Sequence, residues 1–410
     1  MKKTHKLLFP NMCSIHFQIL QKVFLASGYD IELLSTTGHE IVDEGLKYVH
    51  NDTCYPALLT TGQLISALKS GKYDLDHVAL VMSQTGGGCR ASNYIHLLRK
   101  GLKAAGYENI PVVSVNLSGL EKNSGFKITL PMMYRALAAV TYGDLLMLLS
   151  NQTRPYEVTP GETDRVLNKW IGHVAGLFEQ KKGAGAREMN RLFAQITRDF
   201  ASIPIERVPK PKVGVVGEIY VKYCPLGNND LENFLREQGC EVMTPGLLGF
   251  FLYCMANSVH DVELYGGSLV RKKAFQLIVA YLENFQERMF RAVRENGDFT
   301  VPSGIRHLEQ LGQKVIGIGC KMGEGWLLPA EMMELAELGY ENIVCTQPFG
   351  CLPNHIVGKG VLRKIKEQSP RANIVAVDYD PGATRVNQEN RIKLMLAVAR
   401  ENMTEPAEAG

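Results

Sequence analysis

The chain has 410 residues, of which 45% are hydrophobic and 21% are charged, and its formal net charge is +3. This length exceeds what one hydrophobic core usually supports, so we expect a globular protein with at least two domains. Basic residues are scattered, which argues against nucleic-acid binding. We find no apolar run long enough to span a membrane and no signal-peptide cleavage site, so we expect a cytoplasmic protein without a membrane partner.

The first third of the sequence alternates short apolar runs with amphipathic segments. Strands are expected at residues 6–9, 31–34, 77–82 and 111–115, and helices at residues 14–26, 54–68 and 91–105. This alternation predicts a mostly parallel sheet with helices on both faces. We assign residues 1–130 to this first α/β lobe.

Strand signals stop at residue 131. Helical periodicity runs through residues 132–149, 164–180 and 186–200, and a proline-rich stretch follows over residues 203–211. This pattern predicts a helical insertion over residues 131–205.

Strand and helix signals alternate again in the second half. Strands are expected at residues 212–217, 241–244, 314–319, 343–345 and 373–378, and helices at residues 229–238, 247–256, 271–295, 329–338 and 359–367. We assign residues 206–400 to a second α/β lobe and residues 401–410 to a frayed tail. The predicted fold class is α/β, with two doubly wound lobes facing a cleft.

Two short phrases recur in the two halves. A helix ends at Gly28 before a strand, and another ends at Gly239 before a strand. The phrase GYENI also occurs twice, starting at Gly106 and at Gly339. If they reflect an internal repeat, the two lobes have similar folds.

Nine cysteines occur in a chain for which we expect a reducing compartment, so disulfides are not expected. Cys54, Cys89 and Cys351 have neighbours (Pro, Gly, Asn and Arg) that are poor core material. Together with Cys345 they lie near predicted carboxyl ends of strands, where open α/β sheets bind ligands. These cysteines are therefore candidate metal ligands or nucleophiles.

Three consecutive glycines, Gly86, Gly87 and Gly88, precede Cys89. Without Cβ atoms their backbone can approach a bulky inorganic ligand, and their amides can donate hydrogen bonds to cluster sulfides. The sequence has no Cys-x-x-Cys pair, so zinc-ribbon and ferredoxin patterns are disfavoured.

A thiol hydrolase is the competing chemistry. Cys89 between a strand and a helix is typical of a nucleophile elbow, with His77, His96 or His355 as the base. His96 lies about 10 Å along the same predicted helix by rise alone, which is too far for a base. This alternative therefore needs one of the other two histidines.

Longer phrases carry a family resemblance. They are NDTCYPA at residues 51–57, SQTGGGCRASNY at 83–94, QPFGCLPNH at 347–355, GEIYVKY at 217–223 and DYDPG at 378–382. In these phrases the chain resembles the 2-hydroxyacyl-CoA dehydratase and CoA-substrate-specific enzyme activase-related family. The resemblance extends over most of the sequence.

The resemblance implies two flavodoxin-like domains with an iron–sulfur cluster in the cleft, either a [4Fe–4S] cluster or a double-cubane cluster. It implies Cys54, Cys89 and Cys351 as ligands. Cys345 is then a candidate fourth ligand, and Cys13 a candidate for an enlarged cluster.

The resemblance also implies partners. In such proteins an ATPase of the actin/hexokinase type delivers single electrons, and the dehydratases use them to remove water from a 2-hydroxyacyl-CoA. This chain has no phosphate-binding loop, so we expect the activator to be a separate chain. We also expect a homodimer, or a heterodimer with a homologous subunit.

Three further residues are candidates for catalysis. Arg90 and His355 are expected to contact an acyl or phosphate group or to donate to the cluster, although Arg90 could equally pair with a carboxylate. Glu218 is a candidate proton carrier.

We therefore predict a low-potential iron–sulfur redox component that receives electrons from an ATP-dependent activator and acts on a small substrate, such as an acyl-CoA. The alternative is a non-catalytic electron relay or regulatory partner. A substrate-sized cleft beside the cluster would separate the two. A metal-free, two-lobed binding module is a third reading, and it predicts widely separated cysteines.

Overall fold

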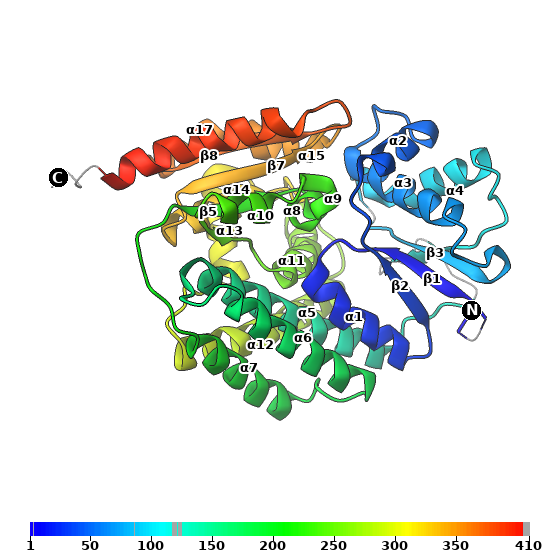
Figure 1. Ribbon diagram of the computed structural model, residues 1–410, viewed down its shortest axis with the longest axis horizontal. Helices are drawn as coiled ribbons and strands as arrows, with labels where there is room; N and C mark the ends of the chain where they lie inside the picture. The colour runs from blue at the N-terminus through cyan, green and yellow to red at the C-terminus, as the bar shows by residue number, and fades with distance from the viewer. Residues whose placement is uncertain (3, 86, 117–120, 122–124, 405–410) are drawn as a thin grey trace.

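The computed structural model describes residues 1–2, 4–85, 87–116, 121 and 125–404. Two four-stranded parallel sheets organise the chain. The first has the order β2-β1-β3-β4 and contains β1 (Lys6–Pro10), β2 (Asp30–Leu34), β3 (Val78–Ser83) and β4 (Val112–Val115). The second has the order β6-β5-β7-β8 and contains β5 (Lys212–Gly217), β6 (Glu241–Met243), β7 (Asn342–Pro348) and β8 (Asn373–Tyr379). The predicted α/β class with two lobes is confirmed (Figure 1).

Helices cover both faces of the first sheet. They are α1 (Ser14–Ala26), α2 (His39–Tyr48), α3 (Tyr55–Lys69), α4 (Tyr94–Ala104) and the short turns η1 (Leu75–His77) and η2 (Arg90–Asn93). Successive strand residues face opposite sides, so Leu8 packs with α3 and α4, whereas Leu7 packs on the other face near Phe24 of α1. Burial of both faces explains why these strands are continuous apolar runs.

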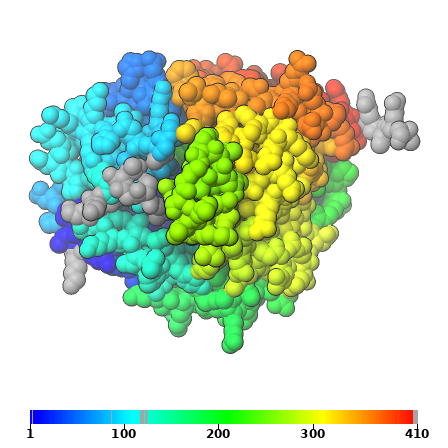
Figure 2. All heavy atoms as spheres, turned by 180° about the vertical axis from the view of Figure 1, so that it is seen from behind, coloured from blue at the N-terminus to red at the C-terminus, as the bar shows by residue number. Residues whose placement is uncertain are grey.

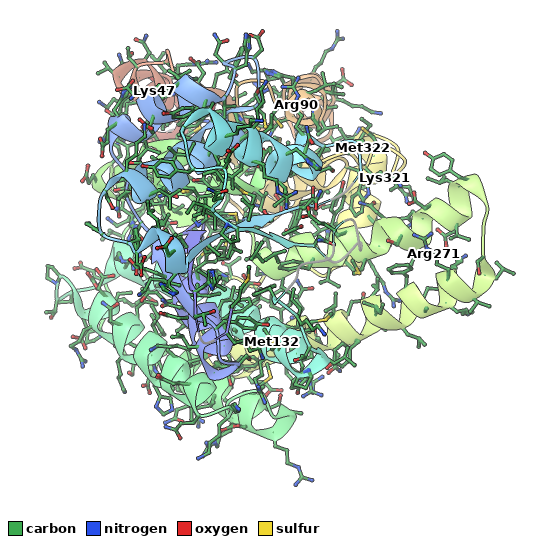
Figure 3. All side chains as sticks on the ribbon, turned by 90° about the vertical axis from the view of Figure 1, so that its right-hand side faces the viewer. Lys47, Arg90, Met132, Arg271, Lys321 and Met322 are labelled. Atoms are coloured by element: carbon green, nitrogen blue, oxygen red, sulfur yellow. The ribbon has the colours of Figure 1, made fainter. Side chains whose placement is uncertain are left out.

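A helical layer lies beneath the two sheets in the view of Figure 1. It contains the three helices predicted between the lobes, α5 (Leu130–Thr153), α6 (Glu162–Glu179) and α7 (Ala186–Ala201), with the turn η3 (Arg154–Tyr156). It is larger than predicted, because α11 (Leu247–Tyr265) and α12 (Leu269–Asn296) of the second half pack into the same core. The tip of the α11–α12 hairpin projects from the surface (Figures 2 and 3).

The expectation that no segment is long and apolar enough to span a membrane fails for one helix of this layer. Leu130–Tyr156 is long and apolar enough to cross a membrane. However, 72% of its most apolar window is buried inside the protein. A helix that is apolar all round belongs in a protein core or a bilayer, and here the core surrounds it.

The second sheet is covered by shorter elements. They are α8 (Ile219–Tyr223), α9 (Pro225–Asn228), α10 (Leu231–Glu237), α13 (Ile305–Val315), α14 (Leu327–Glu337), α15 (Leu352–Asn354), the π-helical turn η4 (His355–Lys359), α16 (Leu362–Gln368) and α17 (Arg385–Thr404). The strand predicted at residues 314–319 is wrong. Ile305, Leu308, Leu311 and Val315 are buried at helical spacing, so α13 extends to Val315 and a glycine-rich loop follows it.

The two sheets have the same strand order, which supports the predicted similarity of the lobes. Gly28 and Gly239 adopt positive φ angles of 88° and 76° before β2 and β6, the equivalent strands of the two sheets. Gly106 and Gly339 also have positive φ, but they precede β4 and β7, which occupy different positions. Only the first of the two recurring phrases therefore corresponds to a repeat of structure.

Candidate functional site

The candidate site lies where loops from both lobes meet at the carboxyl ends of β3 and β7. Three of the predicted cysteines each precede a helical turn here: Cys54 precedes α3, Cys89 precedes η2 and Cys351 precedes α15. The amide of Tyr55 donates a hydrogen bond of 3.0 Å to the carbonyl of Phe349, which joins the two lobes directly. Crevices beyond the carboxyl ends of parallel strands are where α/β sheets bind ligands.

Arg90 fastens this contact between the lobes. Its Nη1 donates to the carbonyl oxygen of Asp52 at 2.8 Å and to that of Gly350 at 3.3 Å. Both acceptors are backbone atoms, so these bonds are neither the substrate contact nor the carboxylate pair expected from the sequence. Arg90 holds the loops that carry Cys54 and Cys351 at a fixed separation.

Gly350 is required by its position. It has a φ of 72°, and a Cβ atom placed there would lie 3.1 Å from the Cα atom of Cys54. Any other residue would be strained and would also press against the opposite lobe. The close approach of the two cysteine loops therefore depends on this glycine.

Three thiols and two carboxyl groups lie near one another at this junction: Cys54, Cys351 and Glu324 are buried, and Cys89 and Glu218 are partly exposed. Desolvation, together with the charges of Glu324, Glu218 and Cys54, raises the pKa of Cys89 to about 12. Burial likewise raises the pKa of Cys351, with added contributions from Glu324, Glu218 and Cys89. Burial also raises the pKa of Cys54, and the charge of Glu218 contributes to that rise. The loops that carry the three cysteines are in contact through Arg90 and Gly350, contrary to the widely separated cysteines of the metal-free reading.

The two carboxylates are held by backbone amides. Glu218 accepts a hydrogen bond of 2.9 Å from the amide of Val221 and begins α8, and Glu324 accepts one of 2.9 Å from the amide of Ile219. Burial and the charge of Glu324 raise the pKa of Glu218 to about 8. A carboxyl with a pKa near neutrality can gain and lose a proton at physiological pH, as the predicted role of Glu218 requires.

The glycine-rich loop over residues 317–326 closes the site from the second lobe. The Met322 Sδ atom accepts a hydrogen bond of 3.2 Å from the amide of Gly88, and Figure 3 labels Met322 and Lys321 near Arg90. Gly323, with a φ of 61°, packs against Pro353 beside Cys351. The first residues of this loop were predicted as a strand, although the density of glycines was an available signal for a loop.

The predicted approach of the Gly86, Gly87 and Gly88 backbone to a bound group is described only in part, because Gly86 lies outside the described residues. Gly87 has a φ of 78° and no atom within 4 Å of an added Cβ, so its backbone conformation is what favours glycine there. A Cβ on Gly88 would meet Met322 Sδ.

The end of β7 carries buried polar atoms that lack hydrogen-bond partners. Gln347 Nε2 donates to His355 Nδ1 at 2.5 Å, but Gln347 Oε1 has no partner in the structure. Asn354 Nδ2 is buried and unpartnered as well. Orphaned buried polar atoms are uncommon, and one explanation for them is a missing bound group.

The remaining two candidate ligands lie elsewhere. Cys345 was expected near the end of a strand, but it lies inside β7, where it pairs with Val216 and Ala376 and is fully buried in the apolar core. Cys13 precedes α1, and its Sγ atom lies 2.9 Å from His16 Nδ1.

The hydrolase alternative lacks support from the three proposed bases. His77 precedes β3, so it lies at the end of the strand opposite to Cys89 and pairs with Asp74 at 2.7 Å. His96 is exposed on α4, and His355 is engaged with Gln347.

In the described part of the chain, no group of three or more Cys, His, Asp or Glu side chains is arranged to hold a single metal ion. An iron–sulfur cluster makes a different demand, because each cysteine binds a different iron and the thiols need not converge on one point. Two surface pockets occur near the amino-terminal ends of β3 and β5, opposite the cysteine site, and none of the three cysteines lines them.

We predict that Gly350→Ala destabilises the protein more than Gly239→Ala does. Gly239 has a similar φ of 76° and open space around an added Cβ, so its variant pays only the backbone cost, about 1–2 kcal/mol. Gly350→Ala adds a collision with Cys54, for a further loss of about 1–3 kcal/mol in the free energy of unfolding. Denaturant unfolding of both variants measures the difference, and equal losses would show that the contact between the lobes is not tight.

We predict that the iron-free protein loses thermal stability as the pH rises from 6 to 9. The pKa of Glu218 rises from 4.5 to about 8 on folding, so the folded state binds a proton more tightly. Its stabilising effect is complete below pH 4.5 and is lost as the pH passes through 8. Glu218→Gln should make the curve of melting temperature against pH shallower, and an unchanged slope would contradict the assignment.

No protein-family model matches the chain, and a search of curated proteins finds no match. The resemblance to the 2-hydroxyacyl-CoA dehydratase and activase-related family therefore stays a prediction from the sequence phrases.

Proposed function

We propose that the chain is a low-potential iron–sulfur redox protein whose cluster is held between the lobes by Cys54, Cys89 and Cys351. The observation that supports this most is that the loops carrying these three cysteines meet between the lobes through Arg90 and Gly350, beside the carboxyl groups of Glu218 and Glu324. Buried acidic groups in proteins are normally paired, because an uncompensated charge in a low dielectric is costly. An iron–sulfur cluster would replace the three thiol protons with iron, and because the core and its three thiolates together keep a negative charge, Glu218 and Glu324 would stay protonated beside it.

The residues present fit such a group. The cysteines come from both lobes, so the cluster would also join them, and Gly350 allows the loops to approach each other. The backbone amide of Asn354 donates to the Cys351 sulfur, and donors near cluster sulfur tune the reduction potential. In both sheets the second strand in the sequence lies on one side of the first strand, and the third strand lies on its other side. This shared order also supports a flavodoxin-like form for each lobe.

The proposed ligand set is smaller than the one expected from the sequence. Cys345 is a core residue of β7 and Cys13 is engaged by His16, so the proposal leaves both out. Three cysteines favour a [4Fe–4S] cluster over a double cubane, and they are one fewer than a complete set of four. The open coordination position would be available to a substrate.

The chain's own residues would have defined tasks around the bound cluster, which supplies one-electron transfer. Arg90 fixes the separation of the two loops, and Met322 holds the backbone of Gly88 beside Cys89. Glu218 would hold a proton beside the cluster at neutral pH and release it to a leaving hydroxyl. With electrons from a separate ATP-dependent activator of the actin/hexokinase-like type, this arrangement would suit dehydration of a 2-hydroxyacyl-CoA.

A second candidate is an electron relay or regulatory partner without a substrate of its own. The two surface pockets described above lie at the opposite ends of the strands from the cysteines, so neither provides a substrate site beside the cluster. In either case a dimer, with a second copy or with a homologous subunit, remains part of the proposal.

We predict about four irons and four acid-labile sulfides per chain in anaerobically purified protein. Cys54→Ala, Cys89→Ala and Cys351→Ala should each lose them together, because the three thiols would hold one cluster. Cys240→Ala is the matched control, because Cys240 is buried like Cys54 and Cys351 but packs in a separate core cluster, and this variant should keep its iron.

Iron absent from wild-type protein, even after reconstitution with iron and sulfide, would refute the proposal. If the cluster is present, adding a 2-hydroxyacyl-CoA to the reduced protein separates the two candidates. A change in its electron paramagnetic resonance spectrum supports the enzyme, and an unchanged spectrum supports the relay.

A further inference from the structure

A second group of chemically active side chains lies apart from the three cysteines. Cys13 Sγ is 2.9 Å from His16 Nδ1, and His16 Nε2 is 2.7 Å from Asp144 Oδ1. All three side chains are buried, with exposed fractions of 5%, 0% and 4%. This is the order of a nucleophile, a base and a group that orients the base.

The surroundings are shaped for these side chains. A Cβ on Gly143 would lie 2.3 Å from His16 Cδ2, so only glycine leaves room for the imidazole. A Cβ on Gly246 would likewise lie 2.8 Å from the Asp144 carboxylate. Two glycines on different segments therefore accommodate one hydrogen-bonded chain of side chains.

The hydrogen bonds fix which groups carry protons. Asp144 accepts bonds of 2.7 and 2.9 Å from the amides of Leu247 and Leu248 at the start of α11, so it acts as a carboxylate. His16 Nε2 must then donate to Asp144. Burial alone would lower the pKa of His16, but the opposing effects of Cys13 and Asp144 raise it to about 10. His16 Nδ1 lies within hydrogen-bond distance of the Cys13 sulfur, so this imidazole can take up the proton of the thiol.

Three further features affect the ionisation of the Cys13 thiol. Cys13 is the residue before α1, where the helix dipole and free amides favour a thiolate. The titratable groups that face it from packed elements are Asp144 of α5, Tyr223 of α8 and Cys224 before α9. Burial raises the pKa of Tyr223 and of Cys224, so both are neutral at physiological pH and do not displace the imidazolium as its partner.

We propose that Cys13, held by His16 and Asp144, is a reactive thiolate that exchanges with small disulfides and related sulfur electrophiles. The Cys13 sulfur attacks one sulfur of the reagent, a mixed disulfide forms, and the second sulfur leaves as a thiolate that takes a proton from His16 or from water. Cys13 is thereby oxidised, and the reagent's leaving half is reduced. The 5% exposure of Cys13 restricts the site to small reagents.

The test uses methyl methanethiosulfonate on anaerobically purified, full-length protein that retains its iron. Attack on this reagent joins a methylthio group to the cysteine and releases methanesulfinate. Peptide mass spectrometry then gives the labelling rate at each cysteine at pH 6 and pH 8. Cys320, a partly exposed cysteine of the loop over residues 317–326, is the internal control.

We expect the labelling rate of Cys13 to change less than about threefold between pH 6 and pH 8. Burial raises the pKa of Cys320, so its ionised fraction and its labelling rate should fall by at least about 80-fold from pH 8 to pH 6. His16→Asn should give Cys13 the same steep dependence as Cys320, with iron content as the check on folding.

Two results would overturn the proposal. One is a Cys13 rate in the wild-type protein that falls as steeply as that of Cys320, or no labelling at Cys13 at either pH. The other is loss of iron in Cys13→Ser, which would return Cys13 to the ligands of the cluster. The wild-type comparison decides the question even if His16→Asn does not fold.

Discussion

Acidic groups are buried together where the two lobes meet, and the arrangement around them follows from this. Burial raises the pKa values of the Cys54, Cys89 and Cys351 thiols, and the charge of Glu218 adds to each rise. Burial also raises the pKa values of Glu218 and Glu324, so all five groups favour their neutral, protonated forms and avoid the cost of a buried charge. Backbone contacts between the lobes keep the groups in place, and the proposed cluster would replace the thiol protons with iron.

The equal strand orders explain why cysteines meet at this junction. In each sheet the second strand is added on one side of the first strand and the third strand on the other side. Open α/β sheets generally bind ligands at the point where the order reverses in this way. Cys13 and Cys224 follow the first strands, β1 and β5, whereas Cys89 and Cys351 follow the third strands, β3 and β7. Cys13 is the proposed thiolate, with Cys224 facing it, and Cys89 and Cys351 are proposed ligands of the cluster. Two thiol sites with different environments therefore lie along one junction.

Much of the fold could be predicted, because the strands are continuous apolar runs and the long helices have clear periodicity. Residues 314–319 could not, because alternating Ile and Gly imitate a strand where α13 ends and a loop begins. The cysteines of the site were found from their unusual neighbours. His16 and Asp144 were missed because they are 128 residues apart, and only the packing of α1 on α5 brings them together. The role of Arg90 as a link between lobes depends on backbone acceptors that no residue pattern reveals.

The most direct test of the account is anomalous diffraction at the iron absorption edge from crystals of anaerobically purified protein. The account predicts one iron peak between the lobes, bounded by the sulfur atoms of Cys54, Cys89 and Cys351, with Glu218 and Glu324 beside it. Absence of iron at that position, or iron bound only at other residues, would contradict the claim that the buried acidic groups between the lobes form a cluster site.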